Sequence, residues 1–199
     1  MSAIVKTRKK RGKTPGPPVC DDLVNRDFTA TAANELWLVD ITEHRTREGK
    51  IYLCAVKDVF SRRIVGYSIS DRMKARIAVD AVNNAVARRG DVTGCVVHSD
   101  RGSQFWSRKF LRALEYHGLV GSMGSVGAAG DNAAMESFFA LLQNNVLNRR
   151  AWVTREQLRS AIVVWIEKKY HRKRRQAALG SLTPIEFETM IVSPVAQAA

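Results

Sequence analysis

The sequence predicts an α/β protein built around a mixed β-sheet, and three observations support this class. Three strand-like runs joined by short polar connections come early in the chain. After residue 74, runs with helical spacing alternate with short apolar runs. No apolar run approaches the roughly 18 residues of a membrane span. A sheet with helices on its faces is the architecture that such an order of elements favours.

The three early runs cover residues 35–44, 51–60 and 63–70. Their connections, 45–50 and 61–62, are too short for a crossover helix. We therefore expect an antiparallel meander.

The period then changes to that of a helix over residues 75–88, and Gly90 ends this run. A buried strand is expected at 94–100 and a further strand at 120–123. Between them, Ser107 is a candidate N-cap of a helix that ends at His117–Gly118.

Two more helix starts follow near the C-terminus. Thr154-Arg-Glu-Gln157 has the pattern of a capping box ahead of an amphipathic run. Thr183-Pro184 places proline at the first position of a short helix. We divide the chain into a basic extended N-terminal arm (1–34), a core (35–150) and a C-terminal helical extension with a basic segment (151–199).

The net charge of +13 is concentrated near the two ends. Residues 6–13 hold six basic residues and no acid, and residues 149–175 carry a net charge of +8. A nearly neutral core with basic flanks suits a polyanionic partner such as nucleic acid. A solvated helix face is the alternative. The expected DNA contacts in the second segment are Lys168, Lys169, Arg172, Lys173, Arg174 and Arg175.

Three carboxylates occupy positions that suggest chemistry. Asp40 and Asp100 each close an apolar run, and Glu136 lies near the start of a predicted helix. An acid at the end of a buried strand is unfavourable unless it is paired or holds a cation. Divalent cations with oxygen ligands would relieve the repulsion among three such groups. The alternatives are a paired structural acid for Asp40, a turn residue for Asp100 and a solvent-facing residue for Glu136.

The helix that carries Glu136 has an apolar stripe formed by Met135, Phe138, Phe139, Leu142 and Val146. At roughly 100° per residue, Glu136 falls about 105° from the centre of that stripe. It therefore borders the packed face without being buried in it.

The blocks 37–42, 98–105 and 131–139, which contain the three acids, resemble those of Asp-Asp-Glu insertion-sequence transposases with a retroviral-integrase-like core. The ending 170–187 is similar to the end of those proteins. The likeness extends over about residues 21–188.

The resemblance implies a ribonuclease-H-like fold with a five-stranded mixed sheet, three antiparallel strands then two parallel, helices on both faces and C-terminal helices. It further implies that Asp40, Asp100 and Glu136 are catalytic and bind two Mg²⁺ ions, for which Mn²⁺ substitutes. The family cleaves DNA at the ends of a mobile element and transfers the freed strands to other DNA.

Further DNA contacts are expected beside these acids, at Arg101, Ser103 and Gln104. Gln143 stands where the family often has a DNA-contacting lysine, so that contact lacks its charge. The N-terminal helix-turn-helix region of the family has no counterpart ahead of residue 34. We therefore expect a catalytic core without the region that recognises the element ends.

The expected partners are double-stranded DNA and further copies of the chain, with no membrane, in the nucleoid-containing cytoplasm of a bacterium. Two alternatives remain. The chain is a non-catalytic DNA-binding remnant or regulator derived from a transposase, or it is a ribonuclease-H-like nuclease.

Overall fold

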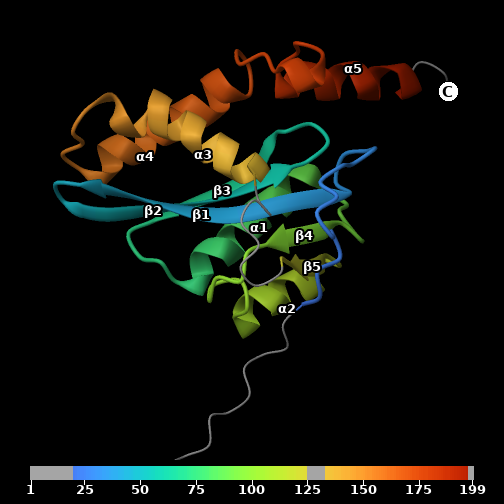
Figure 1. The fold of residues 1–199 in the computed structure, drawn as a ribbon, viewed down its shortest axis with the longest axis horizontal. Helices are drawn as coiled ribbons and strands as arrows, with labels where there is room; N and C mark the ends of the chain where they lie inside the picture. The colour runs from blue at the N-terminus through green and yellow to red at the C-terminus, as the bar shows by residue number, and fades with distance from the viewer. Residues whose placement is uncertain (1–19, 125–132, 197–199) are drawn as a thin grey trace, which may run out of the picture.

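A computed structural model describes residues 20–124 and 133–196, with side chains described up to residue 191. Five strands form one sheet in the order β3-β2-β1-β4-β5 (Figure 1). β1 pairs antiparallel with β2 and β2 with β3, whereas β1–β4 and β4–β5 are parallel pairs. The predicted mixed sheet is confirmed. The strands are β1 (Leu36–Thr46), β2 (Gly49–Asp58), β3 (Ile64–Ser70), β4 (Val96–Ser99) and β5 (Val120–Met123).

Helices cover both faces of the sheet, as predicted: α1 and α2 lie on one side, and α3 and α4 on the other (Figure 1). The described α-helices are α1 (Ala75–Arg89), α2 (Arg108–Tyr116), α3 (Ala133–Asn145), α4 (Arg155–Val164) and α5 (Pro184–Ala196). The short helical segments are η1 (Leu147–Arg149), the π-helical η2 (Trp165–Tyr170) and η3 (Ala177–Leu179). None of the described helices is long and apolar enough to cross a bilayer.

Alternate residues of β1 enter two separate hydrophobic cores. Trp37 and Val39 pack in the core of α1 and α2, whereas Leu36 and Leu38 pack in the core of α3 and α4. Side chains on one face of a strand therefore belong to one helical layer. This alternation determines which residues of β1 and β2 face the candidate site.

Close packing of α1 against β3 depends on Gly66. A Cβ at this position would come within 2.3 Å of the Ala81 carbonyl oxygen, a distance that real Cβ atoms do not reach. The glycine lets the helix lie directly on the strand.

The predicted N-caps at Ser107 and Thr154 are confirmed. Ser107 Oγ accepts a hydrogen bond from Phe110 N at the start of α2, and Thr154 Oγ1 accepts one from Gln157 N at the start of α4. At α5, Thr183 Oγ1 accepts from Glu186 N, while Glu186 Oε2 accepts from Thr183 N. This reciprocal pair satisfies two donors that a helix start leaves free.

The amphipathic run after Thr154 does not continue as an α-helix, because it widens into the π-helical η2 at Trp165. The wider turn buries two adjacent residues, Tyr170 and His171. His171 Nε2 accepts a hydrogen bond from Ile64 N over 3.1 Å, and Tyr170 Oη donates one to the Arg62 carbonyl over 2.8 Å. The C-terminal region is thereby attached to β3 and to the turn that precedes it.

The proposed N-terminal arm, 1–34, is described only from residue 20, so its most basic part lies outside the described residues. Residues 20–34 contact the core. Val24 is buried, and Leu23 N donates a hydrogen bond to Ser122 Oγ on β5.

Candidate catalytic site

Asp40 lies in β1 on the face that Leu36 and Leu38 share, towards the layer of α3. Its side chain is half-buried, and Oδ1 accepts a hydrogen bond from Ile41 N over 2.6 Å. The strand holds the carboxylate in place because β1 is paired on both sides, with β2 and with β4.

Asp100 follows the last residue of β4, whose Ser99 is in register with Val39 of β1. The parallel pairing therefore brings the residues after Val39 and Ser99 to the same region of the sheet. Asp100 Oδ1 accepts a hydrogen bond from Gly102 N over 2.9 Å, which fixes the turn. Its side chain is exposed.

Glu136 lies in the first turn of α3 and is exposed. Its helix packs through Met135, Phe138 and Leu142, all buried in the core beneath α3. The sequence prediction that this acid borders the packed stripe is confirmed. Of the block 131–139, residues 131 and 132 lie outside the described residues.

The charges of Asp100 and Glu136 act on Asp40. The pKa of Asp40 is raised from 3.8 to about 6, chiefly by burial and also by the negative charges of Asp100 and Glu136, against the lowering effect of the hydrogen bond from Ile41 N. Across the described residues, no basic side chain forms an ion pair with any of the three. Asp40 is therefore influenced by two further negative charges and has no ion-pair partner among the described residues.

The carboxylates do not form a closed ligand set. Within residues 20–124 and 133–196, no three His, Cys, Asp or Glu side chains are placed so that they could hold one metal ion together. The donor chemistry nevertheless fits Mg²⁺, which takes carboxylate oxygens and retains several waters. A divalent cation would also favour the ionised form of Asp40, whose pKa is raised chiefly by burial and further by the charges of Asp100 and Glu136.

The side chains expected to contact DNA near Asp100 differ in their exposure and in whether they already form hydrogen bonds within the protein. Arg101 Nε donates a hydrogen bond to the Gly124 carbonyl over 2.8 Å, so this side chain links the turn after β4 to the end of β5. Ser103 is exposed and Gln104 half-buried. Gln143 Nε2 donates to Asn148 Oδ1, close to the end of α3.

The basic segment 168–175 is exposed except for the two buried residues described above. Arg175 is ion-paired with Glu186 and donates to the Ser181 carbonyl. The side chains of the other five cations have no hydrogen-bond or ion-pair partner among the described residues: Lys168, Lys169, Arg172, Lys173 and Arg174.

This segment does not adjoin the acids. Lys169, Lys173 and Arg174 line a hollow of about 200 Å³ with Asn145, the last residue of α3. Asn145 lies about 13 Å along the helix axis from Glu136, at 1.5 Å per residue. The cations therefore lie at the opposite end of α3 from the carboxylates.

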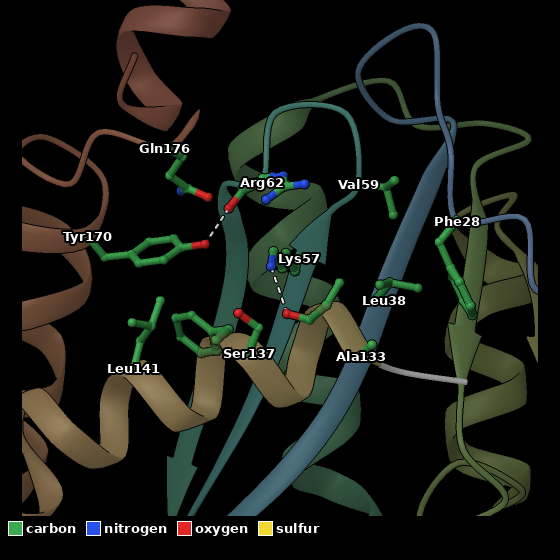
Figure 2. A pocket seen from close by; sticks show the side chains of 12 residues that line it. Phe28, Leu38, Lys57, Val59, Arg62, Ala133, Ser137, Leu141, Tyr170 and Gln176 are labelled. Atoms are coloured by element: carbon green, nitrogen blue, oxygen red, sulfur yellow. Dashed lines mark hydrogen bonds between the residues drawn. The ribbon is translucent and has the colours of Figure 1, made fainter. Parts of the chain in front are cut away.

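Sequence reasoning missed Lys57, a buried cation beside the first turn of α3. Only 5% of its surface is exposed, and its Nζ donates a hydrogen bond to the Ala134 carbonyl over 2.8 Å (Figure 2). The alternation of residues along β2 could have indicated the burial of Lys57. Ile51, Leu53 and Ala55 alternate along β2 and all face α3, and Lys57 continues this row.

Sequence reasoning also missed a buried charge cluster that attaches α5 to the core. Arg89 of α1 is ion-paired with Asp58 of β2 and with Glu188 of α5. Glu188 also pairs with Arg63 over 2.6 Å. These residues are distant in sequence, so no local pattern indicates the cluster.

Comparison with known proteins agrees with this architecture. Two family models described as "Integrase core domain" match residues 30–129 and 117–184. The chain is 40% identical over 173 residues to the transposase InsF of insertion sequence IS3A from Escherichia coli K12, covering 87% of this chain and 60% of that protein. It is 38% identical over 167 residues to the transposase of IS904 from Lactococcus lactis, covering 84% and 66%. The chain thus spans about two thirds or less of these relatives.

Among solved structures, the HTLV-2 integrase catalytic core domain in complex with magnesium, in a trimeric form, superposes with a TM-score of 0.62 at 16% identity. The match covers 80% of this chain and 99% of that one. This likeness confirms the predicted ribonuclease-H-like fold of integrase catalytic cores. By its sequence match and its strand order, the chain belongs to the integrase core domain family.

Proposed function

We propose that this chain is the catalytic core of a transposase that cleaves and transfers DNA strands in a metal-dependent reaction. The observation that supports the proposal is the pKa of Asp40 on an integrase core fold, which is raised to about 6, chiefly by burial and further by the charges of Asp100 and Glu136. Perturbed carboxylates in such a position are typical of functional sites.

The protein's part in the reaction is to hold three acidic groups in place. Ile41 N orients the Asp40 carboxylate and Gly102 N that of Asp100, while α3 carries Glu136. We assign these residues as ligands of two Mg²⁺ ions, for which Mn²⁺ substitutes. When bound, such ions activate the attacking oxygen and stabilise the leaving oxygen of a displacement at phosphorus.

The proposed substrate is double-stranded DNA at element ends and at the target. The transposase relatives support this assignment, as does the net charge of +13. We assign DNA contacts to Arg101, Ser103, Gln104 and Gln143, and to the exposed cations of segment 168–175. We also propose that the chain acts as a homo-oligomer in the bacterial cytoplasm, at the nucleoid; its relatives are bacterial, and the HTLV-2 core has a trimeric form.

The direct test is strand cleavage and transfer on element-end duplex in Mg²⁺ or Mn²⁺. Asp100→Asn should abolish product formation and leave the thermal unfolding midpoint within a few degrees of the parent. Asp80→Asn, which changes a partly exposed acid of α1 paired with Arg76, is the matched control and should retain activity. A fully active Asp100→Asn protein would show that the site is assigned wrongly.

One observation favours the alternative of a non-catalytic DNA-binding remnant, namely that the described acids form no closed metal-binding set. If this alternative holds, the parent binds duplex DNA but leaves it uncut in both metals. An RNA–DNA hybrid, used as a second substrate in the same assay, tests the ribonuclease-H-like alternative.

A further inference from the structure

A pocket of about 390 Å³ opens between the turn that joins β2 to β3, the start of α3 and the segment after η2 (Figure 2). Its volume lies within the range of small-ligand sites. Phe28, Phe138 and Tyr170 supply apolar wall, and Lys57, Arg62 and Gln176 supply hydrogen-bond donors. Among the described residues, no carboxylate lines it.

Lys57 is the central feature of this pocket. It occupies a β-strand row whose other members are apolar, at a β-bulge in the β2–β3 pairing between Val56 and Lys57. Bulges re-aim side chains. The ammonium group has three N–H donors, and among the described residues only the Ala134 carbonyl accepts from it.

No described acid compensates this buried charge. Lys57 forms no ion pair among the described residues, and the nearby charge that acts on it is another cation, Arg62. A buried cation without a counter-charge is unfavourable in the free protein. An anion in the pocket would remove this cost.

Two further donors are available for the same anion. The Arg62 guanidinium has no hydrogen-bond or ion-pair partner among the described residues. Gln176 Nε2 is buried and has no hydrogen-bond partner of normal geometry, although the amide lies close to the Tyr170 hydroxyl. The backbone of Gln176 is fixed by pairing with Leu182. A buried donor without an acceptor costs free energy that a bound oxygen would restore.

The position of the pocket at the start of α3 also favours a negatively charged ligand. Ala133 and Ala134, at the N-terminal end of α3, form part of its wall, and the helix dipole favours negative charge there. Ser137 also lines the pocket and directly follows Glu136 in the chain. A group bound here therefore lies beside the helical turn that carries a candidate catalytic acid.

We propose that this pocket binds a phosphate group through Lys57, Arg62 and Gln176. When the chain engages DNA, the group is a backbone phosphate of the strand that passes the acidic site; this part rests on the proposed function. A free phosphate or a mononucleotide offers the same chemistry, and the experiment separates the two sources.

The first arm measures DNA binding by fluorescence anisotropy at several salt concentrations. Each phosphate contact contributes about 0.9 to the slope of log affinity against log salt concentration. Lys57→Met should lower the slope by about that amount. Gln176→Leu should weaken binding without changing the slope, because an amide carries no charge. The matched control, Lys50→Met, removes a cation of the same strand that is already paired with Glu43.

The second arm uses inorganic phosphate and a mononucleotide without DNA, read by thermal unfolding. If the pocket takes free phosphates, both ligands raise the unfolding midpoint of the parent and of Lys50→Met. That rise should be absent in Lys57→Met and smaller in Gln176→Leu. Chloride at equal ionic strength controls for screening.

The outcomes separate the possibilities. A lower slope for Lys57→Met supports the DNA phosphate, and a specific thermal response supports the free ligand. If the slope equals that of Lys50→Met and phosphate stabilises all variants equally, the proposal is overturned. Because the second arm needs no DNA, a failure of the proposed function does not obscure this result.

Discussion

Lys57 Nζ donates its hydrogen bond to the backbone carbonyl of Ala134, and so joins the end of β2 to the helical turn that carries Glu136. The two residues are 77 positions apart. The contact fixes the start of α3 relative to β1, on which Asp40 lies. The cation thereby positions an acid that it does not itself pair with.

Burial lowers the pKa of Lys57 from 10.5 to about 8, and the charge of Arg62 acts in the same direction. Between these two pH values the unfolded chain binds more protons than the folded protein, so stability rises with pH. Below pH 8 the full cost of the buried charge, about 3 kcal/mol, is present. Lys57→Met removes this titration.

We therefore expect Lys57→Met to be at least as stable as the parent at pH 7. The stability difference should shift by about 3 kcal/mol in favour of the parent between pH 8 and 10.5. Urea unfolding at several pH values measures it. A difference independent of pH would show that the lysine is not desolvated.

The ionisation of Asp40 changes the stability with pH in the opposite direction to that of Lys57. Its pKa is raised from 3.8 to about 6, so between these values the folded protein binds more protons and stability falls as pH rises. Above pH 6 the ionised carboxylate costs about 3 kcal/mol. Asp40→Asn should therefore unfold at a higher temperature than the parent at pH 7, and the gain should vanish near pH 3.8.

A divalent metal ion should reverse the order of stability of the parent and Asp40→Asn. Mg²⁺ should raise the unfolding midpoint of the parent and leave that of Asp40→Asn unchanged, because a ligand stabilises the form that binds it. Differential scanning calorimetry with and without Mg²⁺ measures both effects. Equal responses of the two proteins would mean that Asp40 takes no part in metal binding.

Much of the fold follows from the sequence. Alternation, helical period and the caps at Ser107 and Thr154 act locally, so they indicate the elements and their order. The position of Glu136 beside the apolar stripe follows from helix geometry alone. The family resemblance supplied the ribonuclease-H-like topology, which local patterns leave open.

What the sequence could not predict depends on distant contacts. Lys57 meets Ala134, and the π-helical turn at Trp165–Tyr170 arises where His171 reaches the backbone of β3. The buried ion pairs of Arg89 are of the same kind. The spacing of the acids also depends on how β4 and α3 are placed, and no local pattern determines that distance.

His171 should be important for stability. Its Nε2 accepts from Ile64 N in a buried position, so His171→Ala leaves that donor unpaired and a cavity behind. We expect a loss of about 2–4 kcal/mol in the free energy of unfolding. His117→Ala, whose ring contacts Asn83 at the surface, is the control and should cost less than about 1 kcal/mol. Urea unfolding measures both, and equal losses would contradict the assignment.

The cations at the end of α3 should act on DNA through charge. Replacing Lys169, Lys173 and Arg174 with glutamine should lower the salt slope of DNA binding by up to about 2.7, if each contacts one phosphate. Arg175→Gln should change the slope less, because Arg175 is already paired with Glu186. Anisotropy titrations over a range of salt concentrations measure these slopes. Slopes equal to that of the parent would indicate a solvated helix face.

The most direct test of the central claim is anomalous diffraction from a crystal of this chain soaked with Mn²⁺. Our interpretation predicts a peak among the carboxylates of Asp40, Asp100 and Glu136, with oxygen atoms of at least two of them within about 2.5 Å of the ion. Mn²⁺ bound elsewhere, with these carboxylates free of metal, would contradict it.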